Sequence, residues 1–138
     1  MAQKYYLDTS IWLDLFENRN EPNLPKGQLV NELLNNIIKE DARIVCSEII
    51  KNEMIAIGYS KYEITELFLL FKRIILWVHS DRRQFGKAKD LSKKNDIPLF
   101  DALHAIIARD NRAIMVTRDK HFEKLLDITI YKKPEELI

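Results

Sequence analysis

Four acidic side chains could do chemistry together: Asp8, Glu53, Asp101 and Asp119. Asp8 and Asp119 follow strand-like runs, Asp101 stands in the first turn of a helix-like run, and Glu53 lies within another helix-like run. Two carboxylates about 4 Å apart repel each other by ~4 kcal/mol at an effective dielectric constant of about 20. Several of them in one cleft would take up protons, move apart or hold a cation. Hard oxygen ligands suit Mg²⁺ or Mn²⁺, and no cluster of His and Cys offers a tetrahedral zinc site. The acidic set predicts a Mg²⁺ or Mn²⁺ centre if the fold brings its members together.

Each of the four acids also has an ordinary structural explanation. Asp8 and Asp101 could each complement the positive end of a helix, which contributes ~0.3–1 kcal/mol at an exposed site. Glu53 could be a solvated helix residue, and Asp119 could be a turn residue. Which explanation holds depends on the elements that carry these side chains.

Short strand-like runs alternate with helix-like runs along the chain. Strands are predicted for residues 4–7, 43–46, 74–78, 113–116 and 128–131, and helices for residues 11–16, 28–39, 47–57, 62–71, 80–95, 101–110 and 121–126. This alternation is typical of an α/β domain whose parallel sheet is covered by helices. Ligands of such sheets bind outside the carboxyl ends of the strands, where Asp8 and Asp119 stand.

Apolar spacing indicates which faces of these elements are buried. The helix over 28–39 is expected to bury one face made of Leu29, Leu33, Leu34, Ile37 and Ile38. Ser47 is expected to cap the next helix, which would also bury Ile57. The run LFLLF at 67–71 is apolar throughout, which leaves two interpretations, core packing on both sides or a contact between subunits.

Four motifs carry a resemblance to a known family: YYLDTSIW, SEIIKNE, PLFDALHAIIA and MVTRDKHF. In order and spacing they resemble the PIN-domain ribonucleases, which include VapC-type toxins of type II toxin–antitoxin pairs. The resemblance implies a doubly wound, PIN-like sandwich with about five short parallel strands. It also implies a metal-binding quartet of Asp8, Glu53, Asp101 and Asp119. Thr117 matches a hydroxyl residue beside the last acid, while Thr9 and Ser10 match small hydroxyl residues after the first.

The activity implied by this resemblance is Mg²⁺- or Mn²⁺-dependent hydrolysis of RNA by an endoribonuclease, with the role of a VapBC-type toxin. Asp8 and Asp101 would be the principal ligands, while Glu53 and Asp119 would bind through water, complete a second site or orient the nucleophile. Many relatives have a further acid where this chain has His121, which leaves the number of metals open. The implied partners are RNA, an antitoxin protein and a second copy of the chain. Two alternatives remain, a non-catalytic PIN-like binding module and a structure-specific DNA nuclease.

Substrate binding would have to come from cations outside the acidic cleft. The helix over 80–95 has a local excess of positive charge, which is either a solvated face or an RNA-binding face; its cations are Arg82, Arg83, Lys87, Lys89, Lys93 and Lys94. Arg118, next to Asp119, is a second candidate for holding a phosphate. His104 lies one helical turn after Asp101, and it is expected to be a packed or hydrogen-bonded histidine rather than a ligand.

The remaining composition fits an ordinary globular protein. The 138 residues suit one domain, 1–138, and the formal net charge of +1 excludes a strongly basic coat for nucleic acid. Cys46 is the only cysteine, so that an intramolecular disulfide is excluded and a buried, inert thiol is expected. The start, MAQK, lacks the apolar core of a signal peptide, and no apolar run reaches the ~20 residues that span a bilayer. A cytoplasmic location without membrane contact is expected.

Overall fold

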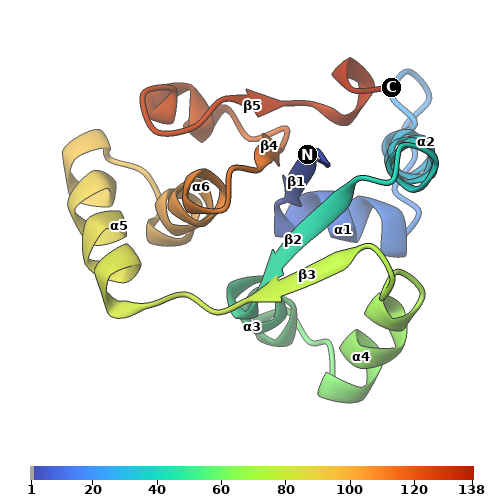
Figure 1. Ribbon diagram of the computed structural model, residues 1–138, viewed down its shortest axis with the longest axis horizontal. Coiled ribbons are helices and arrows are strands. Elements are labelled where there is room, and N and C mark those ends of the chain that lie inside the picture. Colours follow the sequence, from blue (N-terminus) through green and yellow to red (C-terminus); the bar gives the residue numbers. More distant parts are fainter. Residues whose placement is uncertain (1) are drawn as a thin grey trace.

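The computed structural model describes residues 2–138 and centres on one parallel, five-stranded sheet (Figure 1). The strands follow the order β3-β2-β1-β4-β5, and every paired neighbour is parallel. Their bounds are β1 Lys4–Leu7, β2 Arg43–Ser47, β3 Ile75–Val78, β4 Ile114–Val116 and β5 Tyr131–Lys132. The predicted α/β fold with a parallel sheet of about five short strands is confirmed. Because all strands run the same way, their carboxyl ends lie along one edge.

Helices cover this sheet on both sides. Figure 1 shows α1 and α2 on one side of the sheet, α5 and α6 on the other, and α3 and α4 beyond β3. Their bounds are α1 Thr9–Phe16, α2 Lys26–Lys39, α3 Glu48–Ala56, α4 Lys61–Leu69, α5 Arg82–Asn95 and α6 Leu99–Asp110, with 3₁₀ turns η1 Lys120–Leu125 and η2 Pro134–Glu136. Each strand-to-strand crossover passes through at least one helix or 3₁₀ turn, as parallel pairing requires.

The helix α6 is the most deeply buried of these elements, and it fixes the position of Asp101. Its residues 102–108 are all buried, including alanines at 102, 105 and 108. Alanine side chains leave room for a neighbouring helix to approach closely, and α5 contributes the fully buried Ala88. Asp101 therefore stands in the first turn of a helix that has little freedom to move.

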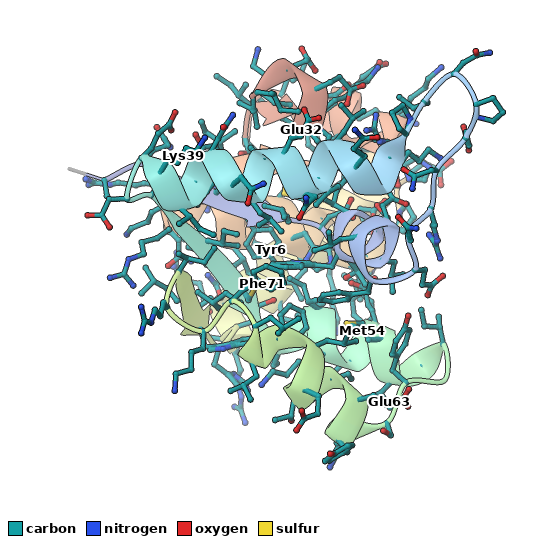
Figure 2. All side chains as sticks on the ribbon, turned by 90° about the vertical axis from the view of Figure 1, so that its right-hand side faces the viewer. Tyr6, Glu32, Lys39, Met54, Glu63 and Phe71 are labelled. Atoms are coloured by element: carbon teal, nitrogen blue, oxygen red, sulfur yellow. The ribbon has the colours of Figure 1, made fainter. Side chains whose placement is uncertain are left out.

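Three details of the core differ from the sequence predictions. The helix α2 buries Val30, Leu33, Leu34 and Ile37, whereas Ile38 is 54% exposed and Leu29 only partly buried. The apolar stripe is therefore rotated towards Val30. Ile57 is also exposed, because α3 ends at Ala56, one residue before it. Figure 2 looks onto α2 and shows Tyr6, Phe71 and Met54 lying between α2 and α4.

The run LFLLF does not pack on both sides. Phe68 is buried and forms edge contacts with Trp12, Phe16 and Trp77 at centroid distances of 4.9, 5.4 and 5.3 Å. Leu69 and Leu70 point outward and are 53% and 77% exposed. Core packing therefore explains Phe68 but not the two leucines that follow it.

The last strand begins later than predicted. The amides of Ile128 and Thr129 both donate to the carbonyl of Leu125, at 2.9 and 3.0 Å, which holds these residues in a turn. The chain can pair with β4 only after this turn, so that β5 starts at Tyr131. The predicted helix over 121–126 is a 3₁₀ turn, Lys120–Leu125.

The single cysteine and the helices also bear on two of the sequence predictions. Cys46 is fully buried in β2, and burial raises the pKa of its thiol, as expected of an inert cysteine. Within residues 2–138 no helix combines the length and the apolar character needed to cross a membrane.

Candidate metal centre

Asp8 and Thr117 leave two neighbouring strands at the same level. Leu7, the last residue of β1, is in register with Val116, the last residue of β4. The Asp8 amide donates to the Val116 carbonyl at 3.1 Å, and the Thr117 hydroxyl donates to Asp8 Oδ2. Thr117 Oγ1 also accepts from the Asp119 amide at 3.0 Å. Strand pairing thus places the loop of Asp119 beside Asp8.

The second carboxylate oxygen of Asp8 caps α1. Oδ1 accepts from the backbone amide and from the hydroxyl of Ser10, both at 2.6 Å. Asp8 therefore does cap the amino-terminal end of α1, as its structural explanation proposed. With a residue exposure of only 7%, this carboxylate is also buried more deeply than a helix cap requires.

Asp101, Asp119 and His121 form a compact cluster. Each offers one ligand atom, and these atoms all lie within 4.8 Å of one another. His121 Nδ1 lies 2.8 Å from Asp101 Oδ2 and 3.1 Å from Asp119 Oδ1. The His121 amide also donates to Asp119 Oδ1 at 2.9 Å. His121 therefore lies between two carboxylates.

The electrostatics of this cluster indicate uncompensated negative charge. Burial, together with the neighbouring charges of Asp119 and Asp8, raises the pKa of Asp101 to about 6, although the hydrogen bond from His121 acts in the opposite direction. The same hydrogen bond raises the pKa of His121. A carboxyl group with this pKa is one whose charge needs a counter-ion. Among the described residues, His121 is the nearest cation that the chain itself can supply.

Glu53 reaches the same edge from α3. Its Oε1 accepts from the Thr9 hydroxyl at 2.7 Å and lies 2.5 Å from His104 Nε2. Burial alone would raise the pKa of Glu53, but the hydrogen bonds from His104 and Thr9 outweigh it and the pKa is lowered. Since Thr9 directly follows Asp8, this contact ties Glu53 to the first acid. His104 is a buried, hydrogen-bonded histidine, as expected.

Two residues of this edge were not identified from the sequence as part of a site. The Tyr6 hydroxyl lies 2.6 Å from His104 Nδ1 and 2.8 Å from Ser47 Oγ. Ser47 stands at the start of α3, but its side chain makes no capping hydrogen bond, contrary to expectation. It bonds Tyr6 instead. In the sequence, the only sign of this contact was that Tyr6 and Ser47 each carry a polar atom in or next to an otherwise apolar strand.

Arg118 is held by an ion pair with the last turn of the chain. Its two terminal nitrogens lie 2.8 and 2.9 Å from the Glu135 carboxylate, and Nε lies 4.0 Å from Asp14. To bind a phosphate, Arg118 would have to leave Glu135. Asp14, at 4% exposure, is a buried acid that the sequence analysis did not single out, although it stands in the apolar helix IWLDLF.

The fold therefore brings acids from four separate segments to one edge of the sheet. Asp8 and Asp119 are linked through Thr117, Glu53 is linked to Thr9, and Asp101 lies in the field of Asp8 and Asp119. Carboxylate oxygens with one imidazole nitrogen suit Mn²⁺, and the oxygens alone suit Mg²⁺. The donor set and the raised pKa of Asp101 both fit a divalent cation at this edge.

Comparisons with known proteins agree with the fold. A family model described as PIN domain matches residues 5–126. Among solved structures, VapBC2 from Rickettsia felis, bound to a DNA fragment from its promoter, has a TM-score of 0.68 at 17% identity, covering 95% of this chain and 98% of that chain. VapBC-1 from nontypeable Haemophilus influenzae has a TM-score of 0.66 at 23% identity, covering 96% and 99%.

A toxin–antitoxin complex from Klebsiella pneumoniae is also similar, with a TM-score of 0.61 at 21% identity, covering 86% of this chain and 89% of that chain. At these identities the likeness to the solved structures concerns the fold. No curated protein matches this chain in sequence.

Proposed function

This chain belongs to the PIN-domain family, and we propose that it is a Mg²⁺- or Mn²⁺-dependent endoribonuclease. The observation that supports this proposal is the meeting of four acids at the carboxyl edge of the sheet; they come from the N-cap of α1, from α3, from α6 and from the loop after β4. Burial and the neighbouring acids raise the pKa of Asp101 to about 6. A perturbed carboxyl group of this kind is typical of a functional site rather than of acids that only stabilise the fold.

Each residue of the site has its own role in this proposal. Asp8 and Asp101 would hold the cation, and Asp119 and His121 would complete its surroundings. Glu53 would bind the cation through water and orient the water that attacks the phosphorus. Thr117 and Ser10 hold the Asp8 carboxylate in place through hydrogen bonds to its two oxygens. When bound, a divalent cation neutralises phosphate charge and lowers the pKa of water near it, which favours hydrolysis of a phosphodiester bond.

RNA binding would use cations beside this edge. The helix α5 packs along α6, which carries Asp101, and all six of its basic side chains are exposed. Of the six, Arg83 has a carboxylate partner, Asp110 at 3.5 Å. The other five have none within 4.0 Å in residues 2–138, so that they are available to phosphates; these are Arg82, Lys87, Lys89, Lys93 and Lys94.

Removal of the cation should abolish the activity. With Mn²⁺ or Mg²⁺, the protein is expected to cleave single-stranded RNA, and excess EDTA should stop cleavage until the cation is restored. The assay compares labelled RNA and DNA of one sequence on a denaturing gel. Cleavage of DNA alone would establish the structure-specific DNA nuclease, and cleavage of neither, with Mn²⁺ still bound, would establish the non-catalytic module.

We further propose that this nuclease is the toxin of a VapBC-type pair, held by an antitoxin protein and acting in the cytoplasm. The likeness to the Klebsiella toxin–antitoxin complex over 86% of this chain supports this role. Expression of the chain alone should stop the growth of a host cell, and co-expression of the small protein encoded by an adjacent gene should restore it.

A homodimer is the third element of this proposal. Leu69 and Leu70, together with Ile38 and Phe71, line an apolar hollow of about 410 Å³ on the surface. Exposed leucines in such a hollow favour contact with a second copy of the chain. Leu70→Lys is expected to convert a dimer at micromolar concentration into a monomer in sedimentation velocity, with unchanged thermal unfolding. A wild-type protein that sediments as a monomer would remove the dimer from the proposal.

A further inference from the structure

We infer that Tyr6, His104 and Ser47 form a buried positioning chain that aims the carboxylate of Glu53, and that the cation affinity of the acidic edge depends on it. This inference rests on the proposed function. It goes beyond the four acids, because it assigns a role to three residues that lie behind them.

The chain of hydrogen bonds runs from the core to the site without a break. Ser47 Oγ lies 2.8 Å from the Tyr6 hydroxyl, which lies 2.6 Å from His104 Nδ1. His104 Nε2 then lies 2.5 Å from Glu53 Oε1. Ser47 and Tyr6 are fully buried and His104 is 2% exposed, so that solvent cannot replace the contacts among these three residues. A buried polar group that loses its hydrogen-bond partner destabilises the fold, and this cost holds the chain of hydrogen bonds in one arrangement.

The hydrogen on His104 Nε2 follows from its partner. Because Nε2 faces a carboxylate oxygen, Nε2 donates whether the imidazole is neutral or charged. The hydroxyl of Tyr6 occupies the other ring nitrogen and fixes the plane of the ring. The rings of Tyr6 and His104 also touch, with centroids 5.4 Å apart, so that packing and hydrogen bonding fix the same orientation.

The consequence for Glu53 is an asymmetric carboxylate. Both donors, Thr9 Oγ1 and His104 Nε2, bond the same oxygen, Oε1. Among the described residues, no hydrogen bond or ion pair engages Oε2. Glu53 therefore offers Oε2 to a cation or to a water bound to it. The hydrogen bonds at Oε1 set the direction in which Oε2 points. A glutamate without this support would rotate freely and would spend less time in the productive orientation.

Binding of Mn²⁺, measured by calorimetric titration of the folded protein, tests this positioning role separately from catalysis. His104→Leu removes the donor and is expected to weaken Mn²⁺ binding about tenfold, the lower end of effects seen when partners of metal ligands are removed. His104→Gln places an amide donor near the position of Nε2 and should stay within about threefold of wild type. Tyr6→Phe removes only the hydroxyl and should weaken binding by an intermediate factor.

Tyr59→Phe is the matched control for Tyr6→Phe, since it too removes a tyrosine hydroxyl that makes a 2.6 Å hydrogen bond. Its partner is Glu17, which lies outside the acidic cluster, so that Mn²⁺ affinity should not change. Thermal unfolding of each variant confirms that it is folded. If His104→Leu does not fold, Tyr6→Phe alone decides, because wild-type affinity in that variant would overturn the inference.

Glu53→Gln distinguishes failure of this inference from failure of the proposed function. A wild-type protein that binds no Mn²⁺ would refute the metal centre itself. If wild type binds Mn²⁺ and Glu53→Gln weakens binding while His104→Leu does not, the centre stands and the positioning role is wrong. Equal losses in His104→Gln and His104→Leu would show that the histidine acts through its shape rather than through its donor.

Discussion

Replacement of Asp8 by asparagine is expected to lower cation-dependent RNA cleavage at least ~100-fold while the protein stays folded. The loss corresponds to ~2.7 kcal/mol of transition-state stabilisation, which is a modest part of what a positioned cation supplies. Asparagine has nearly the shape of aspartate but no charge, so that it cannot balance a divalent cation. The rate is measured with excess Mn²⁺ and excess protein over labelled RNA.

The fold should survive this change because the contacts of Asp8 suit an amide. Asparagine Oδ1 can still accept from the amide and the hydroxyl of Ser10. Its amino group would face Thr117 Oγ1, whose hydroxyl can rotate to accept rather than donate. Asparagine is also about as good a helix cap as aspartate. Thermal unfolding should therefore change little.

Asp81→Asn provides the matched control for Asp8→Asn. Asp81 caps α5 as Asp8 caps α1, and its Oδ1 accepts from the Gln84 amide at 2.8 Å. If Asp8 served only as a cap, both substitutions would have the same small effect on cleavage. Full activity in a folded Asp8→Asn protein would refute the assignment of Asp8 as a ligand.

The positions of two of the four acids could be predicted from elementary rules. Asp8 and Asp119 follow strands, and parallel strands end at one edge, so that their meeting follows from the predicted sheet. Glu53 and Asp101 are carried by helices, whose rotation about their axes is set by packing. In α2 the buried face includes Val30 rather than the predicted Ile38. The rotation of a helix about its axis can therefore be mispredicted from apolar spacing alone. Their placement rested on the family resemblance.

The positioning chain could not be predicted, because it depends on contacts between distant residues. Tyr6 and His104 are 98 positions apart, and Tyr6 and Ser47 are 41 apart. In strands buried on both faces, such as β1 and β2, side-chain alternation carries no polar signal. A tyrosine in β1 therefore reads as an aromatic core residue, and a serine at the start of α3 reads as a helix cap.

The short fifth strand was misplaced for a similar reason. Ile128 and Thr129 are β-branched, which favours a strand, but both amides are bound by the Leu125 carbonyl. A turn that uses these donors prevents them from pairing with β4. Local propensity was thus overridden by the geometry with which η1 ends.

Asp101→Asn is expected to stabilise the cation-free protein at pH 7–8 while it removes the activity. Burial, Asp119 and Asp8 raise the pKa of Asp101 from 3.8 to about 6. A shift of roughly two units corresponds to at most ~3 kcal/mol, because one pKa unit is about 1.4 kcal/mol. Loss of a favourable interaction with the α6 dipole, ~0.3–1 kcal/mol, opposes this gain. Chemical unfolding of both proteins without metal gives the difference.

The sign of the pH dependence follows from where the proton sits. Between pH 3.8 and about 6 the folded protein keeps a proton on Asp101 that the unfolded chain releases. The stability that Asp101 contributes is therefore fully present below pH 3.8 and is lost as pH rises through 6. The advantage of Asp101→Asn should accordingly grow across this window and become constant above it. Asp110→Asn on the same helix should show no such growth, because hydrogen bonds and Arg109 outweigh burial and lower the pKa of Asp110.

The same destabilising charge explains why the cation should bind. A ligand that binds only the folded state at 100 times its Kd stabilises the protein by ~2.7 kcal/mol. Saturating Mn²⁺ should therefore raise the midpoint of thermal unfolding of the wild-type protein, and it should raise that of Asp101→Asn much less. A much smaller response in Asp101→Asn would mean that the charge which destabilises the cation-free site is also the charge that holds the cation. An Asp101→Asn protein that is less stable at pH 8 and still responds fully to Mn²⁺ would show that Asp101 is a structural helix residue, because neither its charge nor its proton would then be linked to the ion.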